Sequence, residues 1–170
     1  MNISLIGMMG CGKTTIGKLI AKDLSFSFVD TDSLIVEKEN RSINEIFENS
    51  GEEYFREIET SILKEVLNNQ NQIISTGGGI IKKDENIKLL KEKSIVIYIE
   101  ADVQTLYKRV KNNNERPLLN VDNIQEKITT LLKEREEQYK QAHYKIQTTN
   151  KEPSKIKNEI IGIINEYSRS

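Results

Sequence analysis

Cysteine, histidine and proline are scarce in this chain of 170 residues, which has one, one and two of them. One cysteine cannot form an internal disulfide, so a secreted scaffold built on disulfides is excluded. One histidine and one cysteine supply too few ligands for a zinc site. No apolar run approaches the roughly 20 residues that a membrane-spanning helix needs. The first residues show no basic segment followed by an apolar one, so we expect no signal peptide and a cytoplasmic location.

An excess of either charge is also missing. Lys and Arg number 25 and Asp and Glu number 26, which gives a net charge of −1. Such a balance is not typical of a dedicated nucleic-acid binder, so we expect neither nucleic acid nor a membrane as a partner. The length fits one domain, and we predict a single domain over residues 1–170.

Short apolar runs alternate with segments of helical periodicity. Strands are predicted at 3–6, 26–29, 73–75, 95–99 and 144–147, and helices at 15–24, 43–47, 52–67, 84–91, 103–110, 123–142 and 155–167. This alternation predicts an α/β protein with a mostly or fully parallel five-stranded sheet between two helical layers. Residues 111–122 are too many for a simple turn, and we interpret them as a mobile lid. Pro117 and Pro153 both read as loop residues.

Residues 7–14, Gly-Met-Met-Gly-Cys-Gly-Lys-Thr, match the phosphate-binding pattern G-x-x-x-x-G-K-[ST] in full. They follow a predicted strand and open a predicted helix, which is the context that the pattern requires. The glycines let backbone N–H groups surround phosphate oxygens, and the helix N-terminus adds partial positive charge. Lys13 can reach the outer phosphates and the Thr14 hydroxyl can bind Mg²⁺. The motif therefore predicts a nucleoside triphosphate site, and a glycine-rich turn is the alternative.

Two carboxylates, Asp30 and Asp32, follow the second predicted strand. If the chain stays extended there, side chains two residues apart face the same side. Both would then lie at the carboxyl ends of the strands, where α/β folds bind ligands. One could hold Mg²⁺ and the other could accept a hydroxyl proton. The alternative is that Asp32 only caps a following helix.

Two arginines are predicted to lie among apolar residues. On helix 52–67, Glu59 falls inside the apolar stripe and Arg56 lies at its edge, three residues earlier. A buried acid needs a partner, so we expect Arg56 to pair with Glu59, either as a structural ion pair or to bind an anion. On helix 123–142, Arg135 lies within the stripe that includes Leu131 and Tyr139. Its guanidinium should meet a carboxylate or a bound anion.

Two loops complete the candidate site. Thr76-Gly77-Gly78-Gly79 follows the third strand, and its glycines permit a close approach of the backbone to a ligand, although a flexible turn is the alternative. Arg116, in the segment 111–122, would cover the transferred phosphoryl group and exclude water if that segment is a lid. A solvated loop arginine is the alternative.

Together these motifs resemble the shikimate kinase family, P-loop kinases of the nucleoside-monophosphate-kinase type. The similarity runs over nearly the whole chain. The matching features are Gly7–Thr14, the Asp30-Thr31-Asp32 pair, Phe55-Arg56 with Glu59, Gly77–Gly79, Arg116-Pro117-Leu118-Leu119, and Arg135 with Tyr139 and Ala142. Apart from the P-loop each feature is weak alone, but their order and spacing are specific.

The resemblance implies transfer of phosphate from MgATP to the 3-hydroxyl of shikimate, a step toward chorismate and the aromatic amino acids. It implies a monomer with an acceptor-binding region at about 31–60. The implied catalytic residues are Lys13, Asp32 and Arg116, and the implied Mg²⁺ ligands are Thr14 and Asp30. The implied ATP-binding residues are Gly10, Cys11, Gly12, Lys13, Thr14, Thr15, Arg109, Arg116 and Pro153. The implied shikimate-binding residues are Asp32, Arg56, Gly77, Gly78, Gly79 and Arg135, with Phe47, Phe55 and Glu59 around them.

Other functions remain open at this point. Gluconate also carries a carboxylate and hydroxyls, so a gluconate kinase would satisfy the same electrostatics. A nucleoside-monophosphate kinase fits less well, because only one arginine, Arg116, stands in the predicted lid. A nucleotide-binding regulator without catalysis is the alternative from another class, and degenerate motifs would favour it; here Lys13, Asp32, Arg56, Arg116 and Arg135 are all present.

Overall fold

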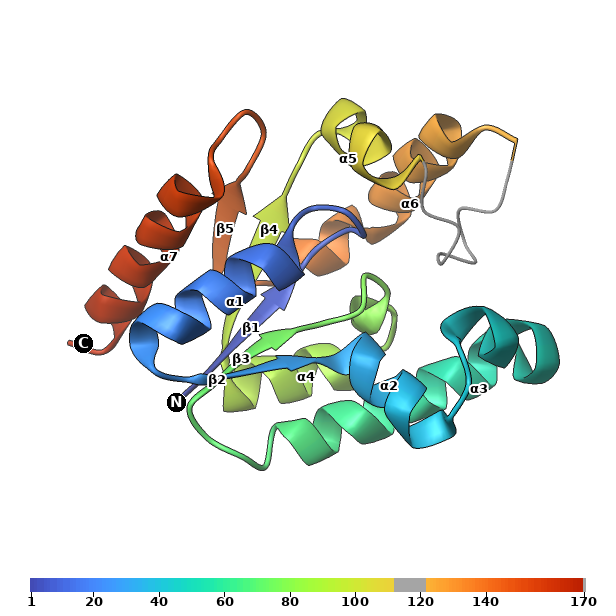
Figure 1. Ribbon diagram of the computed structural model, residues 1–170, viewed down its shortest axis with the longest axis horizontal. Helices are drawn as coiled ribbons and strands as arrows, with labels where there is room; N and C mark the ends of the chain where they lie inside the picture. Colours follow the sequence, from blue (N-terminus) through green and yellow to red (C-terminus); the bar gives the residue numbers. More distant parts are fainter. Residues whose placement is uncertain (112–121, 170) are drawn as a thin grey trace.

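The computed structural model describes residues 1–111 and 122–169. Five strands pair in parallel in the order β2-β3-β1-β4-β5 (Figure 1). Their bounds are Asn2–Ile6 (β1), Ser27–Asp30 (β2), Gln72–Ser75 (β3), Ile95–Glu100 (β4) and Tyr144–Gln147 (β5). The predicted strands and the fully parallel form of the sheet are therefore confirmed. The central strands are continuous apolar runs because both of their faces are covered.

Helices cover the two faces of the sheet and make it the middle of three layers. On one face, α1 (Lys13–Leu24) and α7 (Pro153–Tyr167) lie side by side (Figure 1). On the other face lie the second half of α3 (Ile43–Val66) and α4 (Asp84–Lys93). Strand β4 shows how the layers form: Ile95, Ile97 and Ile99 pack toward the first pair, whereas Val96 and Tyr98 pack toward the second.

Four further elements lie around the carboxyl ends of the strands. They are α2 (Thr31–Glu39), the 3₁₀ turn η1 (Ile80–Lys82), α5 (Val103–Val110) and α6 (Ile124–Tyr139). Strands β3 and β4 lie on opposite sides of β1, so the connections that follow them run in opposite directions. This divergence opens a crevice at the carboxyl end of β1, where open α/β sheets bind ligands. The phosphate-binding motif occupies that position.

The structure corrects two local predictions and confirms a third. Helix α2 was not expected, because its apolar residues Leu34, Ile35 and Val36 are consecutive and give no helical period. The two helices predicted at 43–47 and 52–67 are confirmed as the two halves of α3, which meet at a kink where Gly51 has a non-helical φ of 83°. Pro153 is the first residue of α7 rather than a loop residue, a position where the missing N–H of proline removes no hydrogen bond.

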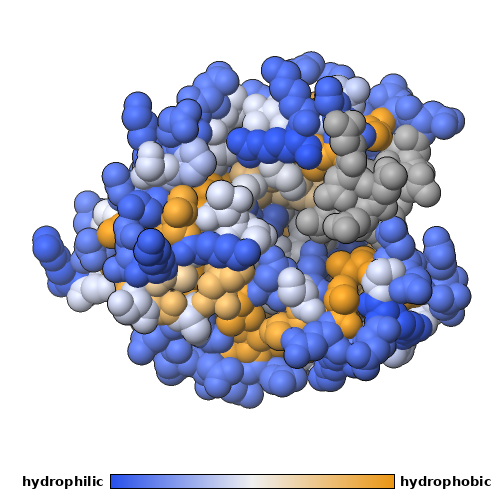
Figure 2. Space-filling model, viewed as in Figure 1, coloured by the Kyte–Doolittle hydropathy of each residue, from blue (hydrophilic) through white to orange (hydrophobic). Residues whose placement is uncertain are grey.

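Hydrophilic side chains cover most of the face seen in Figure 2, as the charge-rich composition leads one to expect, and apolar side chains gather in its lower half. Among the described residues, no helix combines the length and the apolar character that a bilayer crossing requires.

Candidate active site

The phosphate-binding motif forms a loop between β1 and α1. Gly10 and Gly12 have φ of 80° and 105°, a left-handed conformation that glycine adopts without strain. The Lys13 ammonium lies inside the loop and donates to the carbonyls of Gly7 (2.8 Å) and Met8 (3.1 Å). Its contact with the Cys11 sulfur is longer, at 3.6 Å. Sulfur is the weakest of these three acceptors. The Lys13 ammonium would therefore gain a stronger partner if a phosphate oxygen replaced the sulfur.

Asp30 and Asp32 do not lie on one extended strand as predicted. Asp30 is the N-cap of α2 and accepts from the amides of Asp32 (3.1 Å) and Ser33 (3.3 Å), while Asp32 lies in the first turn of that helix. The alternative interpretation of Asp32 as the cap is also wrong. Because capping uses Asp30 Oδ1, its Oδ2 remains for the Thr14 hydroxyl, which donates to it at 2.9 Å.

Thr14 and Asp30 fit a magnesium site in their chemistry. A hydroxyl and a carboxylate are the hard oxygen ligands that Mg²⁺ takes, and two protein ligands leave positions for water and phosphate oxygens. The Ser75 hydroxyl lies 3.3 Å from Thr14 Oγ1 and adds a third oxygen, which the sequence analysis did not identify. Within the described ranges, no cluster of three or more His, Cys, Asp or Glu side chains forms a separate metal centre.

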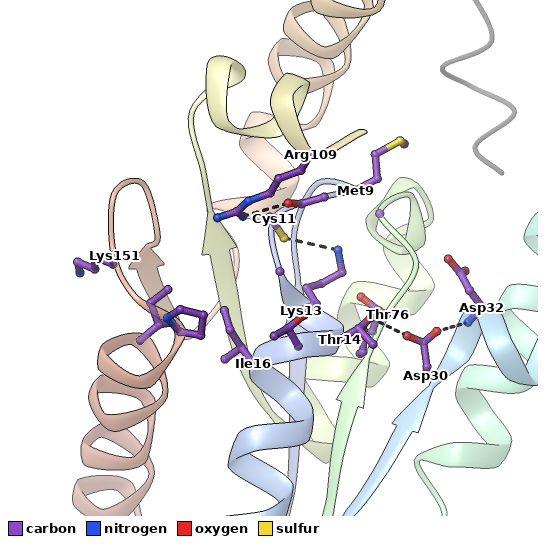
Figure 3. Close-up of a pocket in the computed structure, with 17 residues that line it drawn as sticks. Met9, Cys11, Lys13, Thr14, Ile16, Asp30, Asp32, Thr76, Arg109 and Lys151 are labelled. Atoms are coloured by element: carbon purple, nitrogen blue, oxygen red, sulfur yellow. Dashed lines mark hydrogen bonds between the residues drawn. The ribbon is translucent and has the colours of Figure 1, made fainter. Parts of the chain in front are cut away.

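A cavity of about 380 Å³ runs along the phosphate-binding loop. Figure 3 shows Arg109 and Lys151 on one side of the loop and Asp30 and Asp32 on the other. Arg109 Nη1 donates to the Gly10 carbonyl at 3.1 Å, which ties α5 to the loop. The predicted ATP-binding residues in the described chain all line this cavity: Gly10, Cys11, Gly12, Lys13, Thr14, Thr15, Arg109 and Pro153.

Beyond Asp32 and Gly78, which also line the cavity, the site continues into a buried cluster around the triple glycine. A β-carbon at position 77 would lie 2.7 Å from both Asp32 Oδ1 and Glu59 Oε1. A β-carbon at position 79 would lie 2.5 Å from two nitrogens of Arg56. Glycine thus lets these side chains lie against the loop, and a close approach of the same backbone to a ligand stays a prediction.

Arg56 is held by two carboxylates. Its Nη1 donates to Glu59 Oε2 at 2.8 Å, and its Nη2 donates to Glu52 Oε1 at 3.2 Å, so the predicted Arg56–Glu59 pair is confirmed as a contact. Glu52 also pairs with Lys82 (2.6 Å). Glu59 is fully buried, and burial raises the pKa of its carboxyl, while Arg56 acts in the opposite direction.

Arg135 is also buried, with 3% of its surface exposed. Its Nη1 donates to a main-chain carbonyl, Gly78 O, at 3.1 Å rather than to a carboxylate, and the alternative partner, a bound anion, stays a prediction. Its other terminal nitrogen, Nη2, is buried and has no hydrogen-bond partner among the described residues. A buried cationic N–H without an acceptor is costly, and an anion bound beside Nη2 would remove that cost.

Phe47 and Phe55, the two aromatic residues predicted beside the acceptor, lie against each other with ring centroids 4.8 Å apart. The Arg56 guanidinium lies 5.1 Å from the Phe55 ring centroid, so the aromatic pair adjoins the charged cluster. Arg116 and most of the predicted lid, 112–121, lie outside the described residues.

The comparisons with known proteins identify this arrangement. The family model described as shikimate kinase matches residues 9–165. The chain belongs to the shikimate kinase family. A shikimate kinase from Thermodesulfovibrio yellowstonii is 41% identical over 168 residues, 99% of this chain and 95% of that protein. One from Clostridium botulinum is 44% identical over 162 residues, 95% of this chain and 96% of that protein. Membership in the family makes the chain an ATP-dependent kinase of shikimate in aromatic amino-acid biosynthesis.

Solved structures agree with this placement in the shikimate kinase family. A shikimate kinase from Acinetobacter baumannii in complex with shikimate has a TM-score of 0.95 and 37% identity, covering 98% of this chain and 93% of that one. The enzyme from Aquifex aeolicus has a TM-score of 0.86 and 34% identity, covering 99% and 98%. A deoxyadenosine kinase from M. mycoides, at 19% identity and a TM-score of 0.67, shares the P-loop kinase fold alone; it covers 97% of this chain and 100% of that one.

Proposed function

We propose that this enzyme transfers the γ-phosphoryl group of MgATP to the 3-hydroxyl of shikimate, using the residues of the donor loop and of the buried arginine cluster. The observation that carries the proposal is the position of Arg135 Nη2, a buried donor that has no hydrogen-bond partner among the described residues. Arg135 is bonded to Gly78, which lines the same cavity as the base candidate Asp32. A small acceptor with one carboxylate and several hydroxyls satisfies both groups at once.

On the donor side, the loop amides and Lys13 bind the phosphates, and Arg109 and Pro153 flank the adenine. Thr14 and Asp30 would hold Mg²⁺, which would neutralise negative charge on the nucleotide phosphates. Arg116, outside the described residues, keeps its sequence-based role of stabilising the transferred group.

On the acceptor side, Arg56 and Arg135 bind the carboxylate and the Gly78–Gly79 amides contribute donors. Asp32 orients the attacking hydroxyl and takes its proton, and proton transfer to a positioned side chain contributes typically about 10²–10⁴-fold to a rate. Glu59 holds Arg56, and Phe47 and Phe55 wall the pocket. We further propose that residues 1–170 work as one domain, with a lid at about 111–122, in a cytoplasmic monomer that needs neither nucleic acid nor a membrane.

The test is ADP release from MgATP with shikimate, gluconate or a nucleoside monophosphate supplied separately. Strong stimulation by shikimate alone is expected, with phosphate found on the 3-hydroxyl by NMR. If folded protein that binds MgATP responds to gluconate or a nucleotide instead, the acceptor assignment is wrong. If it responds to none of them, the chain binds nucleotide without this catalysis.

A further inference from the structure

Tyr139, at the end of α6, has a contact that the proposed mechanism does not use. It is 1% exposed, and its hydroxyl donates to the Gly78 carbonyl at 2.7 Å. Its ring stacks on Tyr98 with centroids 4.7 Å apart and planes 6° from parallel. Burial raises the pKa of Tyr139, so the hydroxyl stays protonated and remains a donor at physiological pH.

The same carbonyl also accepts from Arg135, one helical turn earlier on α6. A carbonyl oxygen has two lone pairs, so Gly78 O is fully used by α6. The Tyr139 bond is the shorter of the two, at 2.7 Å against 3.1 Å. A carbonyl held in one position also holds the nitrogen that donates to it, Nη1 of Arg135. Because the guanidinium group is planar and rigid, an anchored Nη1 keeps Nη2 pointing in one direction.

The fixed carbonyl also orients the next amide. The peptide between Gly78 and Gly79 is planar and trans, so the Gly79 N–H points opposite to the Gly78 carbonyl and therefore away from Tyr139. This N–H has no backbone acceptor among the described residues. A β-carbon at position 79 would collide with the Arg56 guanidinium, so Arg56 lies against the same residue. One carbonyl thus sets the directions of two donors, Arg135 Nη2, which has no partner among the described residues, and Gly79 N–H, which has no backbone acceptor among them.

We propose that Tyr139 is a positioning residue for the acceptor carboxylate: its hydroxyl fixes the Gly78 carbonyl and thereby aims Arg135 Nη2 and the Gly79 amide at the anion. The inference rests on the proposed function, because that function supplies the carboxylate. It assigns to Tyr139 an effect on acceptor affinity and none on the donor side or on the chemical step.

Tyr139→Phe tests this, because it keeps the stacked ring and the packing and removes only the hydroxyl. Tyr98→Phe is the matched control, since it removes the hydroxyl from the other ring of the same stack. We expect Tyr139→Phe to raise KM for shikimate roughly five- to tenfold, as the loss of one buried hydrogen bond predicts. Its kcat and KM for ATP should stay within about twofold of the wild type, and Tyr98→Phe should change none of the three.

A second measurement isolates the carboxylate. Dissociation constants for shikimate and for its methyl ester, measured by titration calorimetry, give a preference for the charged acceptor in each protein. In Tyr139→Phe this preference should fall by the same five- to tenfold factor, because the neutral ester gains little from the two aimed donors.

The failures are distinguishable. Wild-type protein without shikimate-dependent ADP release would defeat the proposed function, and the role of Tyr139 with it. If the wild type is active, three results would each overturn the positioning role and leave Tyr139 as a packing residue. They are equal effects of Tyr139→Phe and Tyr98→Phe, equal losses of shikimate and ATP affinity in Tyr139→Phe, and an unchanged preference of that variant for shikimate over the methyl ester.

Discussion

The donor and acceptor halves of this site are built in different ways. The donor half is a stretch of main chain, residues 7–14, whose conformation depends on glycines at 10 and 12. The acceptor half consists of side chains from α2, α3 and α6 that meet around the triple glycine. Three of these, Arg56, Glu59 and Arg135, are charged and almost completely buried.

This difference has an energetic consequence. The donor loop takes its conformation mainly from the positive φ of Gly10 and Gly12, so we expect it to depend less on neighbouring side chains than the acceptor half does. Buried charges depend on every partner, because removing one leaves another without compensation. Substitutions in the acceptor half should therefore have specific effects on one substrate, and the predictions below test that separation.

The largest expected effect is on catalysis. Asp32→Ala should lower kcat about 10²–10⁴-fold, the range that a positioned acid or base contributes. MgATP affinity should change less than twofold, because the proposed function gives Asp32 no part in holding the nucleotide or Mg²⁺. The measurement is single-turnover transfer together with a nucleotide-binding titration. Asp23→Ala, which removes a carboxylate paired with Lys157 on the α1–α7 side, is the control. Near-normal turnover in Asp32→Ala would show that the assigned role is wrong.

The next effect separates the two halves by a matched pair of arginines. Arg135→Ala should raise KM for shikimate roughly 30- to 100-fold, since loss of a charged partner typically costs about 2–5 kcal/mol, with the lower part of that range expected here. Its KM for ATP should hardly change. Arg109→Ala, which loses the hydrogen bond to the Gly10 carbonyl, should raise KM for ATP by a smaller factor and hardly change KM for shikimate. If either variant weakens both substrates equally, the halves are not independent.

The same difference explains what the sequence could predict. The donor loop is contiguous, so its pattern and flanking strand and helix were enough to identify it. Burial of Arg135 followed from helical periodicity, but its bond to Gly78 did not, because the two residues are 57 positions apart and a main-chain carbonyl carries no sequence signal. Ser75 and Lys151 were missed for a similar reason, since each reaches the cavity only through the packing of strand and loop.

Helix α2 shows a second limit. Three consecutive apolar residues gave no period, and the sequence left open whether Asp32 capped a helix. The structure makes Asp30 the cap and leaves Asp32 in the first turn. Both acids line the cavity beside the phosphate-binding loop, but the geometry predicted for the pair was wrong, and their roles stay a prediction.

A smaller effect tests the close approach at the triple glycine. Gly79→Ala places a methyl group where the Arg56 nitrogens lie, so Arg56 must shift, and KM for shikimate should rise roughly tenfold through a weakened charged hydrogen bond. Gly162→Ala in α7 is the control, because a β-carbon there meets nothing within 4 Å. The free energy of unfolding of Gly162→Ala should equal that of the wild type or exceed it by up to about 1 kcal/mol, as for a glycine replaced by alanine in an ordinary helix. Unchanged shikimate affinity in Gly79→Ala would contradict the contact.

The smallest effect concerns the two acids that hold Arg56, which respond to pH in opposite directions. Burial raises the pKa of Glu59 above its ordinary 4.5, with Arg56 opposing and Asp32 reinforcing the shift. The pKa of Glu52 lies below 4.5, mainly because Lys82 donates to it. Above pH 4.5 the unfolded chain loses the Glu59 proton before the folded chain does, so this group's contribution to stability falls as pH rises. Below pH 4.5 the folded chain loses the Glu52 proton first, so the contribution of Glu52 rises with pH and is lost on acidification.

Substitution by glutamine removes each contribution and leaves a hydrogen-bonding side chain. The melting temperature of Glu59→Gln relative to the wild type should therefore increase as pH rises from 4.5. That of Glu52→Gln should decrease as pH rises toward 4.5, and its change should be the smaller one because Glu52 is partly exposed and its pair is screened. If the relative melting temperatures of the two variants changed with pH in the same direction, the pKa values of Glu59 and Glu52 would not be shifted in opposite directions. Burial would then not be what distinguishes the acceptor half from the rest of the site.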